Sequence, residues 1–157
     1  MQARDIIRKL SLQPHPEGGW YREIYRSPTN VGGPKGRRSA LTTIYYLLEQ
    51  HQLSRWHVVD ADEVWHFYRG APLELLAYEP VPEILTRHVL DDPANGPEPV
   101  AVIGAGVWQG ARSLGAFSLV GCSVAPGFEF SDFRFVSGLA EHERHFARGL
   151  KDWQALL

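Results

Sequence analysis

Residues 54–70 read SRWHVVDADEVWHFYRG, and the fold prediction starts from this stretch. Two runs rich in Val, Trp, Phe and Tyr flank a polar turn, Asp60-Ala61-Asp62. Such runs are typical of β-strands, and a short turn between them predicts a hairpin. Because side chains on a strand alternate between its two faces, the hairpin would bring His57 and Glu63 onto one surface.

Strand-like segments continue on both sides of this stretch. They lie at residues 20–25, 41–48, 54–59, 63–69, 73–78, 84–90, 100–103, 107–109, 116–124 and 128–136. Apolar residues at helical spacing occur only near the ends of the chain, at residues 3–10 and 139–157. Because strands do not alternate with helices, a parallel sheet is not expected. The pattern predicts an all-β fold, an antiparallel jelly roll with short terminal helices.

Gly and Pro mark the predicted connections between these segments. The segment PHPEGG at residues 14–19 predicts a loop of fixed shape that carries Glu17. Residues 30–35 predict an irregular connection. Residues 91–99 contain the dipeptide Asn-Gly, which is typical of hairpin turns.

The composition excludes several classes of function. The 157 residues fit one domain, residues 1–157, and 44% hydrophobic with 22% charged residues indicates a folded chain. A net charge of −2 gives no basic surface for nucleic acid. No apolar run approaches the roughly 18 residues of a membrane span, and the first residues are charged where a signal peptide would be apolar. We therefore predict a cytoplasmic protein that binds neither nucleic acid nor a membrane. Cys122 is the only cysteine, which excludes an intrachain disulfide and a thiolate metal cluster.

His57 and Glu63 are the residues whose chemistry stands out. A neutral imidazole and a carboxylate suit metal ligation, and they also suit acid–base catalysis near neutral pH. Strand alternation places Val59 on the face of His57, and Trp65 on the face of Glu63. The plainer alternative is an exposed hairpin end with an ordinary ion pair. The spacing alone leaves both interpretations open.

Other polar residues nearby also have two interpretations. His66 falls on the opposite face from Glu63, where it suits a hydrogen bond at a sheet interface. The segment GAGVWQG at residues 104–110 lacks the G-x-G-x-x-G spacing and a following helix, so it does not predict a dinucleotide site. A tight turn entering a strand would instead present Gln109, a neutral donor and acceptor.

Two charged clusters have ordinary explanations. Residues 35–38, Lys-Gly-Arg-Arg, lie among Gly and Pro and predict a solvated loop rather than a phosphate site. His142 and His145 are three residues apart on the predicted C-terminal helix, a spacing that would allow them to chelate a metal. A surface ion pair between Glu141 and His145 explains them without a ligand.

The register of residues 57–70 resembles the first motif of the cupin superfamily, which runs H-x-H, three or four residues, E, six residues, G. His57 takes the position of the first His, Glu63 that of the Glu, and Gly70 that of the Gly. Val59 stands at the position of the second His.

Residues 104–109 are similar to the second cupin motif, P-x-G-x-x-H, with Gln109 at the position of its His. A metal-binding cupin presents three His and one Glu, of which this sequence retains His57 and Glu63. Val59 cannot coordinate a metal, and an amide oxygen is a poor ligand for divalent transition metals. We therefore expect no bound cofactor, with His57, Glu63 and Gln109 as weak candidates for a partly hydrated metal site.

Longer segments narrow the resemblance to one branch of the superfamily. They read PHPEGGWYREIYRS (14–27), TTIYYLL (42–48), SRWHVVDADEVWHFYRG (54–70), GVWQGA (106–111) and VGCSVAPGFEFSDF (120–133). Together they resemble the Cupin-5 branch, whose members are cupins of unknown function. The resemblance implies a double-stranded β-helix with a pocket inside the barrel, a fold like that of sugar-nucleotide 3,5-epimerases, and a homodimer.

The residues and the resemblance together predict a small-molecule-binding cupin. The leading interpretation is a metal-independent isomerase or epimerase acting on a sugar-like or other small polar substrate. His57 would be the general base, and Glu63 would orient it or shuttle the proton. The ligand-binding residues that we predict are Glu17, Thr42, His66 and Gln109.

Two alternatives stay open. One is a non-catalytic ligand-binding or sensor module that uses the same pocket without proton transfer. The other is a metal-dependent enzyme that uses His57, Glu63 and Gln109 together with water.

Overall fold

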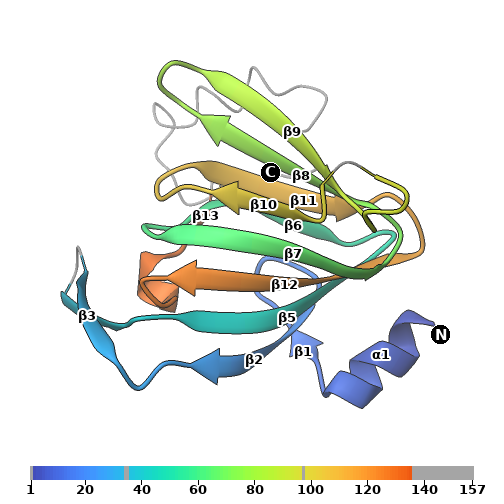
Figure 1. The fold of residues 1–157 in the computed structure, drawn as a ribbon, viewed down its shortest axis with the longest axis horizontal. Coiled ribbons are helices and arrows are strands. Elements are labelled where there is room, and N and C mark those ends of the chain that lie inside the picture. The colour runs from blue at the N-terminus through green and yellow to red at the C-terminus, as the bar shows by residue number, and fades with distance from the viewer. Residues whose placement is uncertain (1, 34–35, 97, 136–157) are drawn as a thin grey trace.

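The computed structural model of the protein describes residues 2–33, 36–96 and 98–135 (Figure 1). Antiparallel strands dominate this part of the chain, which confirms the predicted all-β fold. The elements are α1 (Ala3–Leu10), β1 (Gln13–Pro14), β2 (Trp20–Arg26), β3 (Asn30–Gly33), β4 (Gly36–Ser39), β5 (Thr42–Glu49), β6 (Leu53–Val58), β7 (Asp62–Gly70), β8 (Leu73–Glu79), β9 (Ile84–Leu90), β10 (Val100–Ile103), β11 (Trp108–Ser113), β12 (Phe117–Ala125), the 3-10 helix η1 (Phe130–Asp132) and β13 (Arg134–Phe135).

Two sheets form the body of the jelly roll. One has the strand order β1-β2-β5-β12-β7-β10, and the other has the order β13-β6-β11-β8-β9. Figure 1 shows the two sheets as layers, with α1 at one end and the β3–β4 hairpin at the other. The inward-facing side chains of the two layers form the core, as expected for packed antiparallel sheets.

The core is built mainly from strands whose sequences are apolar almost throughout. In β8, every residue from Leu73 to Tyr78 is buried. Trp65 of β7 and Tyr46 of β5 pack edge to face, with ring centroids 5.9 Å apart. Fully burying side chains of this size contributes about 2–3 kcal/mol each relative to leaving them exposed. The core therefore stabilises the scaffold that holds the polar interior described below.

The stretch 54–70 does not form the predicted hairpin. β6 pairs with β11 and β13 in one sheet, whereas β7 pairs with β12 and β10 in the other. Residues 59–61 therefore carry the chain from one sheet to the other. His57 and Glu63 still face one shared cavity, because each side chain points inward from its own sheet. The hairpin prediction was wrong because a local pattern specifies strands and a turn, but not which strands will pair.

Three other predicted segments also differ. Residues 30–33 of the connection predicted at residues 30–35 form β3, which pairs with β4, where Gly36 has a φ of +112° that favours glycine. Residues 91–99 run from β9 in one sheet to β10 in the other, so the Asn-Gly pair closes no hairpin. The strand predicted at 128–136 is reduced, over its described residues, to η1 and β13. The turn at Pro126-Gly127 and the packing of three Phe side chains inward redirect this segment.

The N-terminal helix forms as predicted. Ile6 of α1 is buried against Leu47 and Leu119 on the six-stranded sheet. In the described part of the chain, no helix is long and apolar enough to cross a membrane. The predicted helix at 139–157, with its His142 and His145, lies outside the described residues. A single domain over residues 1–157 and a cytoplasmic location both stay predictions.

Candidate functional site

A cavity lined by both polar and apolar side chains lies between the two sheets. Its space for the centres of water-sized atoms is about 80 Å³, enough for several water molecules or part of a small ligand. The lining residues are His15, Glu17, Tyr21, Glu23, Arg26, Thr42, Ile44, Tyr46, His57, Val59, Glu63, Cys122, Val124, Phe128, Glu129, Phe130 and Phe133. Burying several ionisable groups in one cavity is costly for folding, so this arrangement indicates a functional site.

His57 is almost completely buried in the wall of this cavity, with 2% of its surface exposed. Its Nδ1 lies 2.7 Å from the backbone carbonyl of Arg55, which can only accept, so Nδ1 carries the hydrogen. Nε2 therefore faces Glu17, whose Oε2 is 3.4 Å away. Phe133 stacks on the imidazole, with ring centroids 4.8 Å apart and an interplanar angle of 18°. The ring is held in one orientation and in one tautomer.

Glu17 occupies this place because of the loop that carries it. Its carboxylate accepts a hydrogen bond of 2.8 Å from the Ser54 hydroxyl, and its backbone N–H donates to His15 Nδ1. Gly18 follows with a φ of +111°, and a Cβ there would lie 2.1 Å from the Leu53 carbonyl oxygen. Only glycine fits so close to the neighbouring backbone. The PHPEGG loop thus positions Glu17 beside His57.

Glu63 lies on the facing sheet, buried on β7. Gln109 Nε2 donates to Glu63 Oε2 over 2.6 Å, and Gln109 Oε1 accepts from Trp65 Nε1 over 2.9 Å. Burial is the main cause that raises the pKa of Glu63 to about 7. The charge of Glu17 acts on this pKa in the same direction, whereas His57 and the hydrogen bond from Gln109 lower it. Glu63 therefore exchanges a proton near neutral pH.

Glu17 is the carboxylate that contacts His57, and the two form an ion pair when the imidazole is protonated. Within the described residues, no ion pair joins His57 to Glu63, although both line the same cavity. An exposed ion pair at a hairpin end, the plainer alternative from the sequence, is excluded because both side chains are buried.

The cupin metal site does not fit the side chains present. Gln109 has both ends of its amide engaged, with the oxygen turned toward Trp65 and the nitrogen toward Glu63. Val59 lines the cavity with an apolar side chain at the position of a ligating His. Among the described residues, no group of three or more His, Cys, Asp or Glu side chains is arranged to hold a metal ion. A metal therefore has no part in the reaction that we propose for this site.

The remaining predicted ligand-binding residues, Thr42 and His66, lie in different places. Thr42 lines the cavity, and its hydroxyl accepts a hydrogen bond of 2.9 Å from the Phe128 N–H. His66 alternates with Glu63 and Trp65 on β7 and is not among the described residues that line the cavity. The structure thus brings Glu17, Thr42, His57 and Glu63 together around the cavity. Gln109 is not among the lining residues and donates a hydrogen bond to Glu63 from behind the lining.

Sequence reasoning missed the segment that covers the cavity. Residues 127–133, which we call the strap, carry Phe128, Phe130 and Phe133 into the lining. The sequence pattern predicts these residues as part of a strand, because Phe128 and Phe130 stand at alternate positions. The preceding Pro-Gly dipeptide was the available signal that the strand stops.

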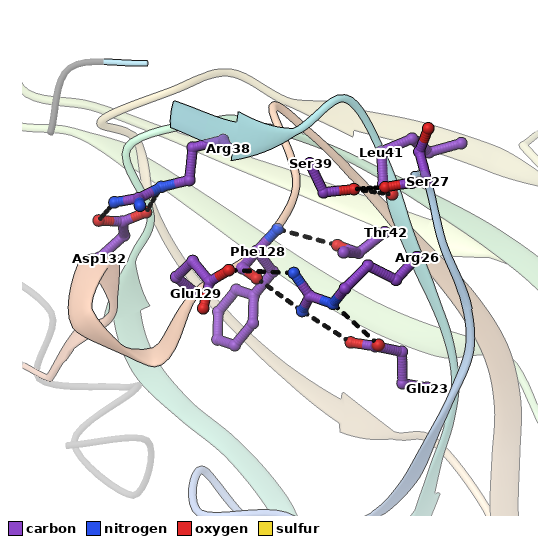
Figure 2. Close-up of polar contacts among 10 residues, drawn as sticks. All are labelled: Glu23, Arg26, Ser27, Arg38, Ser39, Leu41, Thr42, Phe128, Glu129 and Asp132. Atoms are coloured by element: carbon purple, nitrogen blue, oxygen red, sulfur yellow. Dashed lines mark hydrogen bonds and ion pairs between the residues drawn. The ribbon is translucent and has the colours of Figure 1, made fainter. Parts of the chain in front are cut away.

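Charged side chains tie the strap to β2 and β4 (Figure 2). Arg26 donates to the Glu129 carboxylate and to the Phe128 carbonyl, each over 3.0 Å. Arg38 makes two hydrogen bonds to Asp132, of 2.7 and 2.9 Å. Arg38 was predicted to lie in a solvated loop, but its partner is 94 residues away in sequence.

His15 and Cys122 are two further lining residues that the sequence prediction did not place. Burial lowers the pKa of His15, and its Nδ1 accepts the Glu17 N–H, so His15 is neutral at pH 7. Burial raises the pKa of Cys122 well above its ordinary value, and the nearby charges of Glu63 and Glu17 act in the same direction. The thiol is therefore protonated and is not an activated nucleophile.

An antiparallel double-stranded β-helix around a cavity with polar residues defines the cupin class. The particular family follows from the sequence match: residues 4–136 match the family described as Cupin superfamily (DUF985), Cupin_5. The chain belongs to this family.

Two proteins of known structure from distant organisms share the fold over 99% of this chain. A Shewanella oneidensis protein of known structure is 34% identical, with a TM-score of 0.85, over 99% of this chain and 97% of its own. A hypothetical protein from Leishmania major is 28% identical, with a TM-score of 0.84 and the same coverage of both chains. An uncharacterized protein from Saccharomyces cerevisiae is 29% identical in an alignment of 154 positions that covers 86% of this chain and 75% of the yeast protein. The predicted likeness to sugar-nucleotide 3,5-epimerases stays a prediction.

Proposed function

We propose that the protein binds a small polar molecule in the cavity and transfers a proton on it without a metal, as an isomerase or epimerase. The observation that carries this proposal is the buried His57–Glu17 pair. His57 Nδ1 is committed to a backbone carbonyl, and Nε2 faces the carboxylate of Glu17 at 3.4 Å in the cavity wall. The carbonyl orients the ring, so that Nε2, the nitrogen that can take up a proton, lies in the cavity wall with a carboxylate beside it.

Glu63, on the facing sheet, supplies the second proton transfer of the reaction. His57 Nε2 takes a proton from a substrate carbon next to a carbonyl, and Glu17 stabilises the imidazolium that forms. Glu63 reaches in from the opposite sheet and, when protonated, delivers its proton to the other face of the carbon, which inverts that centre. His57 then holds one extra proton and Glu63 lacks one, and exchange with water restores both groups. The sequence-based prediction had Glu63 either orienting His57 or shuttling the proton; in this scheme Glu63 delivers a proton, and Glu17 is the carboxylate beside His57.

Deuterium exchange tests the proposal even while the substrate is unidentified. The protein is incubated with a mixed metabolite extract in D₂O, and mass spectrometry identifies any compound that gains deuterium at carbon. We expect such a compound with the wild type and its loss with His57→Ala. His88→Ala is the matched control, because His88 lies on β9 and pairs with Glu98 outside the cavity.

Two outcomes would contradict the catalytic proposal. Exchange that survives in His57→Ala would remove His57 as the base. A metabolite that binds in native mass spectrometry but never gains deuterium would favour the non-catalytic binding or sensor module.

We also propose that the protein is a homodimer, as the family resemblance led us to expect. The outer face of the six-stranded sheet supports this. Val100, Val102 and Tyr68 are 43%, 61% and 49% exposed on neighbouring strands β10 and β7. A second copy of the chain would remove this apolar surface from water.

A further inference from the structure

The charges around the cavity are predominantly negative. Four carboxylates line its described wall, those of Glu17, Glu23, Glu63 and Glu129, against the single guanidinium of Arg26. No lysine is found among these described lining residues. His15 adds no charge at pH 7, because burial lowers its pKa.

Arg26 is the cation that an anionic ligand would need, but its guanidinium already pairs with carboxylates of the protein. Figure 2 shows its guanidinium between Glu23 and Glu129. Nε and one terminal nitrogen donate to the two Glu23 oxygens over 3.0 and 2.9 Å, and the other terminal nitrogen donates to Glu129 over 3.0 Å. The Phe128 carbonyl accepts a further hydrogen bond from the guanidinium. Four of the five guanidinium N–H donors thus point at acceptors of the protein, so an incoming phosphate or carboxylate could bind two donors side by side only by displacing one of these acceptors.

The inner end of the cavity is equally unfavourable for an anion. Glu17 approaches from the PHPEGG loop and Glu63 from β7, and each raises the cost of a further negative charge near them. The groups that face Glu63 are Glu17 from the PHPEGG loop, His57 from β6 and Cys122 from β12. Of these, only His57 can carry a positive charge; Cys122 and Gln109 stabilise the carboxylate by hydrogen bonds.

Much of the apolar part of the wall consists of the aromatic rings of Phe128, Phe130 and Phe133. Phe128 packs against Phe130 at 5.0 Å and against Phe133 at 5.9 Å, edge to face in both pairs. The faces of aromatic rings attract cations and also stack on the apolar faces of uncharged rings. They offer nothing to an anion.

Building on the proposed function, we infer that the cavity selects its ligand by charge. It takes a compound that is uncharged or carries an amine, and it excludes compounds bearing phosphate or carboxylate. This inference separates the chain from enzymes whose substrates are sugar nucleotides, because their diphosphate would find no free cation in the described part of the cavity.

Matched sets of probes test the selection. One set is benzylamine, benzyl alcohol and benzoate, and the other is glucosamine, glucose and glucuronate, with binding measured by ligand-observed NMR. We expect the amine and the neutral compound of at least one set to bind and the carboxylate to bind at least about tenfold more weakly, because placing like charges together is costly. A carboxylate that binds as tightly as its neutral partner would overturn the inference and leave the proposed function standing. If no probe of either set bound, that result would contradict small-molecule binding itself. It would therefore also contradict the inference about selection by charge.

A charge-neutral variant identifies the groups responsible. Glu129→Gln removes one carboxylate from Arg26, and we expect it to strengthen carboxylate binding by about threefold or more, the usual scale of an exposed ion pair. Glu98→Gln is the matched control, since Glu98 pairs with His88 and does not line the cavity. Carboxylate binding that is the same in Glu129→Gln and in Glu98→Gln would show that the shielding of Arg26 does not decide selection.

Discussion

At the scale of single residues, the cavity depends on groups that are polar, buried and mutually supported. Glu63 illustrates this, because its carboxyl accepts from Gln109, which in turn accepts from Trp65. The amide occupies the place of a metal ligand of the superfamily and instead fixes a carboxyl. From behind the cavity lining, Gln109 therefore holds a carboxyl in place where other cupins bind a metal.

Glu63 makes the stability of the protein depend on pH. Its pKa is raised from an ordinary value of 4.5 to about 7 in the folded state. Between these values the folded state binds more protons than the unfolded state, so this group's contribution to stability falls as the pH rises through 7. We expect the loss from pH 5 to pH 8 to be smaller in Glu63→Gln than in the wild type, by on the order of 3 kcal/mol.

Urea unfolding at both pH values measures this difference. Glu98→Gln, which changes an exposed carboxyl, should lose the same stability as the wild type. Equal pH dependence in Glu63→Gln and in the wild type would mean that Glu63 titrates normally.

Gln109 should be costly to replace by an apolar residue. Gln109→Leu leaves the indole N–H of Trp65 and the Glu63 carboxyl without the amide between them, in a buried environment. We expect a loss of about 1–3 kcal/mol in the free energy of unfolding. It should also move the pKa of Glu63 upward, because the hydrogen bond that lowers this pKa is gone. NMR titration of the Glu63 carboxyl carbon checks the direction, and a downward shift would contradict it.

At the scale of elements, the strap is held by two arginines in different surroundings. The side chains of Arg38 and Asp132 are 13% and 11% exposed, whereas those of Arg26 and Glu129 are 38% and 44% exposed. Solvent screens the second pair much more than the first. The strap therefore has a strong attachment near η1 and a weaker one at the cavity rim.

Paired substitutions separate the two attachments. We expect Arg38→Ala to cost about 3 kcal/mol in the free energy of unfolding, because the bidentate donor to a largely buried carboxylate is lost. Arg26→Ala should cost less than about 1 kcal/mol, as exposed ion pairs do. Hydrogen exchange of the strap amides, together with urea unfolding, measures both effects. A larger loss of stability in Arg26→Ala than in Arg38→Ala would show that Arg26 is the stronger attachment of the strap.

At the scale of the whole molecule, the inner and outer faces of the sheets have different surroundings. Their inner faces enclose the core and the cavity, and the outer face of the six-stranded sheet presents apolar side chains to solvent. We expect Val102→Glu to convert the proposed dimer to a monomer without unfolding it, because a charge on the buried face of an interface is costly to desolvate. Light scattering coupled to size-exclusion chromatography measures the mass. A monomeric wild type would contradict the dimer, and a dimeric Val102→Glu would place the interface elsewhere.

The sequence by itself determined most of the strands, the terminal helix α1 and the family. Strand periodicity and the register from His57 through Glu63 to Gly70 are local properties, and such patterns can be recognised before the fold is known. The same register correctly identified His57 and Glu63 as inward-facing residues.

Only the tertiary structure decided how those residues combine. The partner of His57 is Glu17, 40 residues earlier in the chain. The strap covers the cavity, and its Asp132 pairs with Arg38, 94 residues earlier. The strands β6 and β7, adjacent in sequence, belong to different sheets. Strand pairing, burial and the pKa of Glu63 arise from contacts between distant segments, and no local pattern contains them.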